Sequence, residues 1–560
     1  MNRKFKQLVF VATCTAIALI GFSTWKKSEE AVAANGKKPN VVLIVIDDLG
    51  YSDLTMYGGE VPTPNIESLA KSGTMFTNFH VAPTCSPSRS MLLTGVDNHR
   101  NGLGTMAELL TPAQEGKPGY EGVLNNRVIP ISELLKNAGY NTYMAGKWHL
   151  GHKDGQRPAF RGFNNSFALI QGGGSHFNMI GETLEEKVSM YFDNDQPLKS
   201  MPPNFYSSQY YTDTMIKYID QNRANGKPFF AYSSYTAVHV PLMVPDKYIN
   251  KYLGKYDMGW DKLREQRFNR QKQLGIIPDY LTLPPRWPMV PAWDSLSAEE
   301  KKRNSKIKAI YAGMLDCVDE NIGRLIKHLK DIGEYDNTLF VLISDNGASG
   351  LDFVKDDREN YEKWFKEVGI DTSYENMGRV NSYVTLGLNW AQVSTTPLKW
   401  SKTKQAEGGT RVPAIISYPR GGVKSGVKTD AFAHQLNLVP TILNYTGVKH
   451  PGTTYQGRQV FAPEKPSLAP LLEGKATYVF DQNTPIGQEV FGNTNDAMVL
   501  GDWKILRLTP PWGDNKWALY NLRIDPREIN DLSQMYPEQL KKMVGMYEKY
   551  KKDNGFVPAK

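Results

Sequence analysis

Two apolar runs constrain the fold of this chain more than any other feature of its sequence. Residues 40–46 are NVVLIVI and residues 338–344 are TLFVLIS. Neither run alternates apolar with polar residues, so each suits a parallel strand that is buried on both faces. The segments YNTYMAGK, from residue 140, and PFFAYSSY, from residue 228, are two further candidate strands.

Helical patterns separate these strands along the chain. They cover residues 65–72, 130–139, 210–222 and 307–332. This alternation predicts an α/β domain with a large, mostly parallel sheet sandwiched by helices. The length of 560 residues is too great for one ordinary core, so we expect a smaller domain beside the large one.

Polar residues stand where each predicted strand ends. Asp47 and Asp48 follow the first apolar run, and Asp345 and Asn346 follow the second. Parallel sheets bind ligands outside the carboxyl ends of their strands, so these four side chains should converge. The ends of the other two candidate strands carry Lys147, His149 and His239.

Four convergent oxygen donors, without a Cys/His cluster of zinc spacing, favour a hard divalent cation. We expect Ca²⁺ rather than Mg²⁺, because Ca²⁺ tolerates this many carboxylates in loose geometry. Three carboxylates at one sheet edge would also repel one another without a cation. The alternative is that these residues only cap the helices that follow. Two acidic pairs after two buried strands make the metal site the better prediction.

The first 33 residues have the pattern of a signal peptide. A basic segment at 2–6 precedes an apolar stretch at 8–22, and Ala31-Val32-Ala33 forms a small-residue cleavage site. The apolar stretch is short for a transmembrane helix. We therefore expect export, to the periplasm or the medium, with an uncleaved anchor as the alternative.

The charge of the chain excludes one class of partner. The net charge is +8, and loss of residues 1–33 removes five basic and two acidic residues, which leaves +5. No dense run of Lys and Arg with interleaved aromatic residues is present, which argues against nucleic acid as a partner. A positive pocket for an anionic small molecule is compatible with this mild bias.

Two cysteines, Cys85 and Cys317, follow the predicted signal peptide. Cys317 lies in IYAGMLDCVDENIGRLIKHL, where apolar residues recur at helical spacing, so we expect it in the core. Cys85 then has no obvious disulfide partner. It stands in PTCSPSRSMLLTG, among prolines, serines and an arginine, and this setting points to a chemical role.

Cys85, Pro87 and Arg89, followed by Leu93-Thr94-Gly95, resemble the signature of the formylglycine-dependent (type I) sulfatase family. In that family a maturation enzyme recognises Cys-x-Pro-x-Arg and oxidises the cysteine to formylglycine, an aldehyde. Further segments resemble the family in the family's order, and the mature chain is most similar to bacterial arylsulfatases. These segments are VVLIVIDDLGYSDL, AGKWHLG, TAVHVPL, ISDNGA and EGGTRVP.

The resemblance implies hydrolysis of a small-molecule sulfate ester. The aldehyde at position 85 would be hydrated, and one of its two hydroxyl groups would attack sulfur while the alcohol leaves. Deprotonation of the second hydroxyl would expel sulfate and restore the aldehyde. A serine or a cysteine lacks that second hydroxyl and would stay sulfated.

The resemblance also assigns the site residues. It implies a cation, Ca²⁺, held by Asp47, Asp48, Asp345, Asn346 and the oxygen at position 85, with Asp345 taking the attacking proton and Arg89 holding the position-85 side chain. Alignment on EGGTRVP selects Lys402 over Lys399 and Lys404. Lys147 and Lys402 would neutralise sulfate oxygens, His239 with Lys402 would protonate the leaving oxygen, and His149 would be the base that expels sulfate.

The implied fold is that of the alkaline-phosphatase superfamily. A catalytic domain at 34–425 would precede a smaller α/β subdomain at 426–560, built on a short antiparallel sheet. A phosphonate or phosphate monoester hydrolase of the same superfamily is the alternative function. A dedicated phosphatase usually binds a second metal ion through additional His and Asp ligands, and no such cluster is found in the sequence. An inactive binding protein would have lost a motif, and none is broken.

Overall fold

The computed structural model describes residues 37–492 and 494–560. The predicted signal peptide, residues 1–33, lies outside the described residues. Within the described ranges, no helix combines the length and the apolar character needed to cross a membrane.

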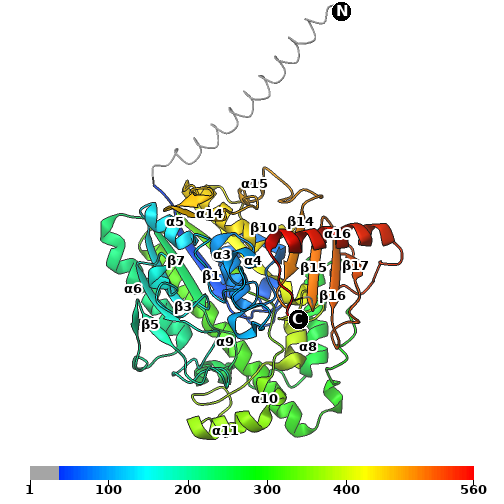
Figure 1. The fold of residues 1–560 in the computed structure, drawn as a ribbon. Coiled ribbons are helices and arrows are strands. Elements are labelled where there is room, and N and C mark those ends of the chain that lie inside the picture. Colours follow the sequence, from blue (N-terminus) through cyan, green and yellow to red (C-terminus); the bar gives the residue numbers. More distant parts are fainter. Residues whose placement is uncertain (1–36, 493) are drawn as a thin grey trace, which may run out of the picture.

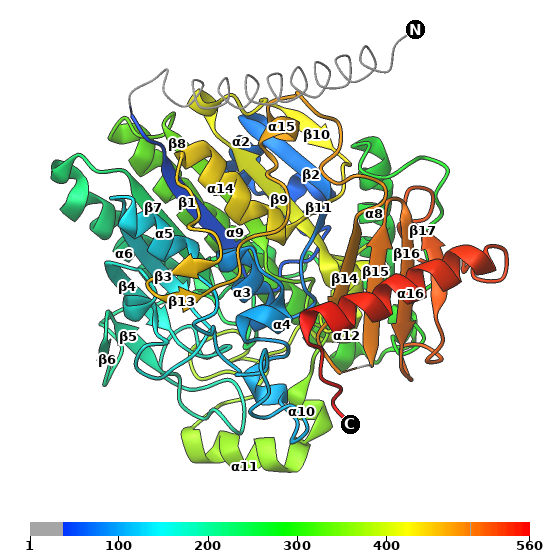
Figure 2. The same cartoon turned by 45° about the horizontal axis from the view of Figure 1, so that its top comes forward.

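A large sheet forms the centre of the molecule (Figure 2). Its middle strands, in the order β8-β1-β7-β3-β4, are all parallel, as the apolar runs predicted. The described residues place 11 strands in this sheet, and β11 pairs with β2 beside the main path. In spatial order they are β10 (Val427–Thr429), β2 (Gly73–His80), β9 (Arg411–Ser417), β8 (Thr338–Ser344), β1 (Asn40–Ile46), β7 (Phe229–Tyr235), β3 (Asn141–Lys147), β4 (Asn165–Leu169), β5 (Tyr191–Asp193) and β6 (Gln196–Pro197), with β11 at Ala433–His434.

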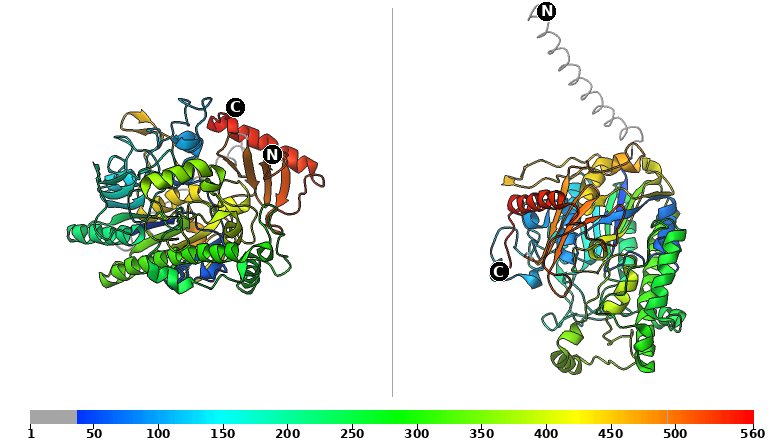
Figure 3. Two further views of the ribbon diagram at one scale, coloured as in Figure 1. Left: turned by 90° about the horizontal axis from the view of Figure 1, so that it is seen from below. Right: turned by 90° about the vertical axis from the view of Figure 1, so that its right-hand side faces the viewer.

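Helices cover both faces of the large sheet, so β1 is buried on both sides. Val42, Ile44 and Ile46 belong to one core cluster, and the alternate residues of β1 belong to the other. The first core contains residues of α2 (Pro64–Lys71), α6 (Ser207–Asn222) and α9 (Ala298–Asp331), and Figure 3 shows the long helix α9 along one face. The second contains residues of α3 (Cys85–Thr94), α5 (Ile131–Asn137) and α14 (Leu438–Thr446).

Helix α9 begins earlier than its apolar pattern indicates. The pattern starts at residue 307, whereas the helix starts at Ala298. A capping box accounts for the difference, because the Ser297 side chain accepts from Glu300 N and Glu300 accepts from Ser297 N. Cys317 lies on this helix and is fully buried, so its predicted core position is confirmed. Cys85 and Cys317 are both free thiols.

A second, smaller sheet follows the large one and is antiparallel throughout (Figure 1). Its strands are β14 (Pro485–Glu489), β15 (Asn495–Leu500), β16 (Trp503–Leu508) and β17 (Ala518–Asn521), and α16 (Pro537–Asn554) packs against it. The predicted fold class is therefore confirmed. The domain boundary at residue 425 stays a prediction, and β10 and β11 beyond it pair with β2 of the large sheet.

Shorter helices and strands connect the elements described above. They are α4 (Asn98–Asn101), α7 (Asp246–Tyr252), α8 (Gly259–Gln273), α10 (Phe353–Asp356), α11 (Arg358–Val368), α12 (Gly387–Ser394), α13 (Glu407–Thr410), α15 (Ala469–Leu472), β12 (Thr454–Tyr455) and β13 (Arg458–Gln459).

A buried histidine joins the small sheet to the large unit. His99, on α4, places its Nδ1 3.0 Å from Asp97 Oδ1 and its Nε2 3.1 Å from Glu489 Oε2, on β14. Burial disfavours the charged ring, but hydrogen bonds and charge attraction from the two carboxylates raise the pKa of His99 to about 9. With a carboxylate at each ring nitrogen, His99 is a donor on both sides.

We expect the stabilising effect of His99 to disappear at alkaline pH. Its folded pKa, about 9, lies above the unfolded value of about 6.5, so its contribution is complete below about pH 6.5 and is lost as pH rises through 9. This increase in the pKa of His99 corresponds to roughly 3 kcal/mol of folding stability when the ring is protonated. His99→Gln should therefore lower the thermal midpoint strongly at pH 6 and only weakly at pH 10. The exposed His152→Gln is the control, and a difference that grew with pH would contradict this account.

Candidate active site

The carboxyl ends of four neighbouring parallel strands meet in one buried cluster. β1 delivers Asp47 and Asp48, and its neighbour β8 delivers Asp345 and Asn346. Asp48 N donates to Asp345 Oδ1 at 3.3 Å, and Asn346 Nδ2 donates to Asp48 Oδ1 at 2.5 Å. The predicted convergence of these four residues is therefore present. Lys147 ends β3, and His239 follows β7.

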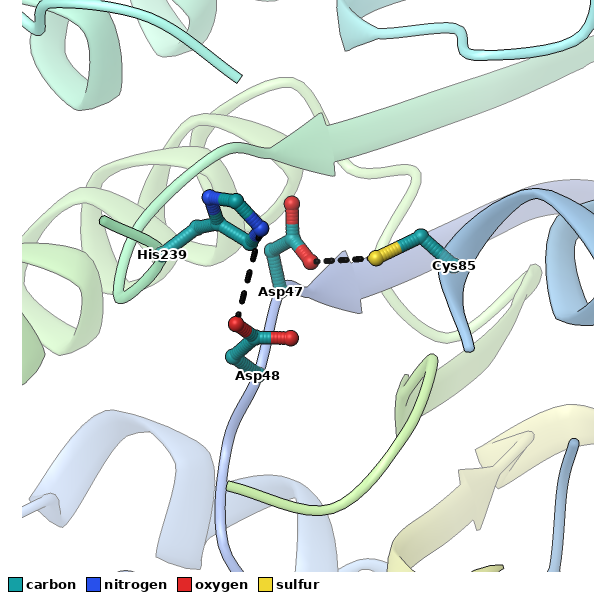
Figure 4. Close-up of side chains that lie close together, drawn as sticks. All are labelled: Asp47, Asp48, Cys85 and His239. Atoms are coloured by element: carbon teal, nitrogen blue, oxygen red, sulfur yellow. Dashed lines mark hydrogen bonds and ion pairs between the residues drawn. The ribbon is translucent and has the colours of Figure 1, made fainter. Parts of the chain in front are cut away.

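Cys85 enters the same cluster from the first turn of α3. Its Sγ lies 3.6 Å from Asp47 Oδ1. Asp47, Asp48, Cys85 and His239 each point one potential ligand atom into a region where these atoms lie within 4.8 Å of one another (Figure 4). The amino end of a helix carries partial positive charge, which favours an anionic group at this position.

The donor atoms of the cluster fit a hard divalent cation. Asn346 Oδ1 and Asp48 Oδ2 are buried and have no hydrogen-bond partner among the described residues. An unsatisfied buried oxygen is costly unless a ligand binds it. Carboxylate and amide oxygens are the ligands that Ca²⁺ and Mg²⁺ prefer.

Three basic side chains neutralise the three carboxylates, which sequence reasoning did not foresee. Lys147 Nζ lies 2.5 Å from Asp47 Oδ2, and Lys402 Nζ lies 2.7 Å from Asp48 Oδ1. The third pair joins Arg89 to Asp345 at 2.8 Å. The expectation that the carboxylates would be uncompensated without a cation is therefore wrong. A metal is favoured instead by the two buried oxygens that have no hydrogen-bond partner among the described residues, Asp48 Oδ2 and Asn346 Oδ1.

Arg89 is fully buried and holds several strand ends together. Its Nε donates to Asp345 Oδ2 at 2.9 Å, and its Nη1 donates to Ser234 Oγ at 2.6 Å and to Lys147 O at 3.1 Å. Burial opposes its charge, but Asp345 raises its pKa further, so it stays protonated. Removing one partner of such a buried pair costs roughly 3–5 kcal/mol. Arg89 is a structural centre of the site.

The charges of the cluster set the protonation of Asp47 and Cys85. Burial raises the pKa of Asp47, but Lys147, Arg89 and Lys402 outweigh it and hold that pKa below its ordinary value. Burial raises the pKa of the Cys85 thiol despite the nearby Lys147 and Lys402. Asp47 is therefore anionic, whereas an unmodified Cys85 is a protonated thiol and a poor nucleophile.

His239 and Lys402 lie together above Asp48. Lys402 Nζ is 3.1 Å from His239 Nε2, and His239 Nδ1 is 2.8 Å from Val240 O. Burial and the Lys402 charge lower the pKa of His239, so the ring is neutral. Its Nδ1–H then donates to Val240 O, and Nε2 accepts from Lys402. Lys402 and His239 together can transfer a proton to a substrate atom that lies between them.

The small sheet fixes the loop that carries Lys402. Asn495, at the start of β15, accepts from Gln405 N at 2.8 Å and donates to Thr403 O. The two other lysines of this loop point elsewhere. Lys399 Nζ donates to Glu528 O at 3.2 Å, and Lys404 Nζ lies 4.2 Å from the Trp512 ring centroid. The geometry agrees with the alignment that selected Lys402.

His149 stands at the open side of the cluster. Its backbone is left-handed, with φ of 60°, and its side chain is 9% exposed. Its Nε2 lies 3.1 Å from Glu108 Oε1, in a short 3₁₀ turn (Ala107–Leu109), and its Nδ1 has no partner among the described residues. Partial desolvation would raise the pKa of Glu108, whose side chain is 40% exposed, but the interaction with His149 lowers it to about 2. Sequence reasoning missed Glu108, because its loop carries no motif.

The tryptophans near the motifs are core residues. Trp148 and Trp390 are fully buried, and Trp400 packs against Trp287 and Trp512. Their burial indicates that they support the loops behind the site.

The sequence of this chain matches one known protein family over most of its length. A family-wide sequence model for sulfatases matches residues 39–448. The chain belongs to the sulfatase family. It is 42% identical over 542 residues to an uncharacterised sulfatase of Schizosaccharomyces pombe, covering 94% of this chain and 96% of that one. It is 39% identical over 422 residues to the arylsulfatase of Klebsiella aerogenes, covering 75% and 89% of the two chains.

Solved structures agree on the fold. The crystal structure of Ps i-CgsB in complex with k-i-k-neocarrahexaose superposes on this sulfatase with a TM-score of 0.66 at 24% identity, covering 92% of this chain and 94% of that chain. At that identity the likeness concerns the fold alone. The family and the arylsulfatase relative make this chain a sulfuric ester hydrolase, which cleaves sulfate monoesters.

Proposed function

We propose that this sulfatase uses formylglycine, made from Cys85 by a maturation enzyme, and one bound Ca²⁺. The observation that carries the proposal is the position of Cys85: it starts α3, within 3.6 Å of Asp47, in a cluster of cation-type ligands. The buried thiol is a poor nucleophile as it stands, whereas an aldehyde hydrate offers two oxygens. The sequence Cys-Ser-Pro-Ser-Arg matches what the maturation enzymes of the family recognise.

Asp47, Asp48, Asp345, Asn346 and the oxygen at position 85 would hold the cation. Its chemistry is that of a Lewis acid, which lowers the pKa of a nearby hydroxyl and neutralises anionic oxygens. Asp47 and Asp48 no longer need their ammonium partners when they serve as ligands. Lys147 and Lys402 are then free to bind the sulfuryl oxygens.

The chain's own residues divide the remaining work. Asp345 takes the proton of the attacking hydroxyl at position 85, whose oxygen bonds to sulfur as the bond from sulfur to the ester oxygen breaks. Lys402 and His239 act together on the departing alcohol: the Lys402 ammonium group supplies the proton, and His239 Nε2, which accepts from Lys402, holds that group in place. His149 removes the proton of the second hydroxyl, which expels sulfate and leaves the aldehyde for the next hydration. Arg89 keeps this end of α3 beside Asp345.

We also propose that the protein is exported through its N-terminal segment. The basic, apolar and small-residue regions at 1–33 support a cleaved signal peptide. The mature enzyme would then act in the periplasm or outside the cell.

Mass spectrometry of the exported protein tests the nucleophile. The peptide that contains position 85 should carry an aldehyde or its hydrate in active preparations, and the mature N-terminus should lie near residue 34. An unmodified thiol in active protein would contradict the proposal. An unmodified thiol in inactive protein would mean that the host had not matured it, and co-expression with a maturation enzyme should then restore activity.

Removal of the cation should abolish turnover. Treatment with a chelator should remove activity, and Ca²⁺ should restore it better than Mg²⁺, because the site offers several carboxylate and amide oxygens. Activity with nitrophenyl sulfate after dialysis and metal addition measures this. Recovery of activity with Zn²⁺ but not with Ca²⁺ would contradict the assignment of a hard cation, which is based on the oxygen ligands.

A further inference from the structure

One buried carboxyl group beside His239 has no part in the steps above. Glu182 lies in a tight hairpin between β4 and β5, in which Ile180 pairs with Val188 and Gly181 N donates to Lys187 O at 2.9 Å. Tyr383 OH donates to Glu182 O at 2.7 Å. The backbone of Glu182 is therefore held from two sides.

A run of glycines leaves space for this carboxyl group and for both site histidines. A Cβ on Gly173 would lie 2.2 Å from Glu182 Oε2 and 3.1 Å from His239 Cε1. A Cβ on Gly172 would lie 2.9 Å from His149 Cε1. A side chain on Gly172 would displace the His149 ring, and one on Gly173 would displace the carboxyl group of Glu182. Glycine at these two positions is therefore what makes room for the carboxyl group beside His239.

The carboxyl group of Glu182 has no hydrogen-bonding partner among the described residues. The neutral ring of His239 lies beside it, with 3.7 Å between Glu182 Oε1 and His239 Nδ1, and that Nδ1 already donates to Val240 O. The residue is 6% exposed. Burial raises the pKa of Glu182 to about 8, although Lys147 and Lys402 act against it. The Glu182 side chain is 8% exposed, so water reaches its carboxyl group in the free enzyme, and a ligand that displaces this water has to supply a hydrogen-bonding partner in its place.

The exposure of the site residues indicates which part of the substrate lies near Glu182. Arg89 and Lys147 are fully buried at the bottom of the site, whereas Lys402 is 6% and His149 is 9% exposed. The sulfuryl group must sit at the bottom, against the nucleophile, so the leaving group extends to the more accessible side. Glu182 is on that side, adjacent to the histidine assigned to the leaving oxygen.

We propose that Glu182 binds a hydroxyl group on the leaving group, on the carbon next to the sulfated carbon. This inference rests on the proposed function, because it uses the role of His239. A hydroxyl group both donates and accepts, so it suits the carboxyl group in either protonation state. The substrate class is thus sulfate esters with a neighbouring hydroxyl group, as in catechols and sugars, in preference to simple aryl or alkyl sulfates.

Two substrates that differ only in this hydroxyl group test the proposal. They are 2-hydroxy-4-nitrophenyl sulfate and 4-nitrophenyl sulfate, and the quantity measured is the ratio of their kcat/KM values. Glu182→Leu, which removes both polar atoms, should lower this ratio about tenfold. Glu185→Leu, on the exposed part of the same hairpin, is the matched control and should leave the ratio unchanged. The amount of active enzyme cancels in the ratio.

Equal losses on both substrates would overturn the proposal and make Glu182 a residue that positions His239. An unchanged ratio would overturn it as well. If Glu182→Leu fails to fold, Glu182→Gln keeps the volume and should lower the ratio about threefold, since the amide still bonds to a hydroxyl group but has a fixed donor and a fixed acceptor. Failure of the proposed function would appear differently: wild-type protein carrying formylglycine and Ca²⁺ would hydrolyse neither substrate.

Discussion

Cys85→Ser should reduce sulfatase turnover by at least about 10³-fold while the protein stays folded. The serine hydroxyl fits the space of the thiol, because the side chain at position 85 is small, buried and starts α3. Serine has one oxygen, so a sulfated serine offers no second hydroxyl whose deprotonation could expel sulfate. One slow turnover per molecule is the expected limit. Steady-state hydrolysis of 4-nitrophenyl sulfate, with circular dichroism as the folding check, measures this.

The chain offers a matched control for this change. Cys317→Ser makes the same substitution at the other buried thiol, on α9, where the side chain packs in the core away from the cluster. It should cost stability and leave turnover per folded molecule unchanged. Full activity of a Cys85→Ser protein whose serine is unmodified by mass spectrometry would rule out the aldehyde mechanism.

Arg89 is a poorer test of the mechanism than Cys85, although both belong to the signature. The guanidinium group joins α3 to the ends of β8, β3 and β7 through Asp345, Lys147 O and Ser234. Its removal would leave a buried carboxylate without a partner and cost roughly 3–5 kcal/mol. Loss of activity in an Arg89 variant would therefore mix loss of folding with loss of chemistry.

The sheet and its site edge were predictable because burial on both faces leaves a local signal. β1 and β8 consist of apolar residues without alternation, and their polar ends mark the carboxyl edge. The start of α9 was missed because residues 298–306 are mostly polar and carry no apolar pattern. The capping box at Ser297 and Glu300 was the signal available there.

Helix α8 could not be assigned a role from sequence because its buried face mixes apolar residues with arginines. Arg267 on α8 is almost fully buried and bonds to Asp53 and Glu60, which lie about 200 residues earlier in the chain. An arginine in a polar helix looks solvent-exposed until its acidic partners are placed beside it. Pairing of this kind depends on the tertiary fold, which no local pattern encodes.

The site residues that sequence reasoning missed are the acidic ones in loops. Glu108 and Glu182 become part of the site only when the loops after other strands bring them to His149 and His239. One signal was present, since the run Gly172–Gly174 follows β4 and marks a close approach of backbone to other groups. The sequence does not say which groups approach it.

Lys402→Ala should lower kcat/KM for 4-nitrophenyl sulfate about 10²–10³-fold, whereas Lys404→Ala should change it less than about threefold. Lys402 Nζ touches both Asp48 and His239, so its loss removes a charge from the sulfuryl oxygens and the proton for the departing alcohol. Lys404, two residues away, bonds to Thr403 Oγ1 and lies over the Trp512 ring, outside the cluster.

Lys402→Ala and Lys404→Ala each remove one positive charge from the same loop. A loss of activity in Lys402→Ala alone therefore reports the contacts of Lys402 in the site and not the change in net charge. Ca²⁺ should keep Asp48 compensated in the Lys402→Ala protein, so thermal midpoints measured with Ca²⁺ should differ little between the two variants. The loss should appear in kcat as well as in KM, since the proton for the departing alcohol passes through the same pair of residues. A larger loss in Lys404→Ala would mean that the loop has a different register in the active enzyme. The clamp of Asn495 on Thr403 and Gln405 argues against such a shift.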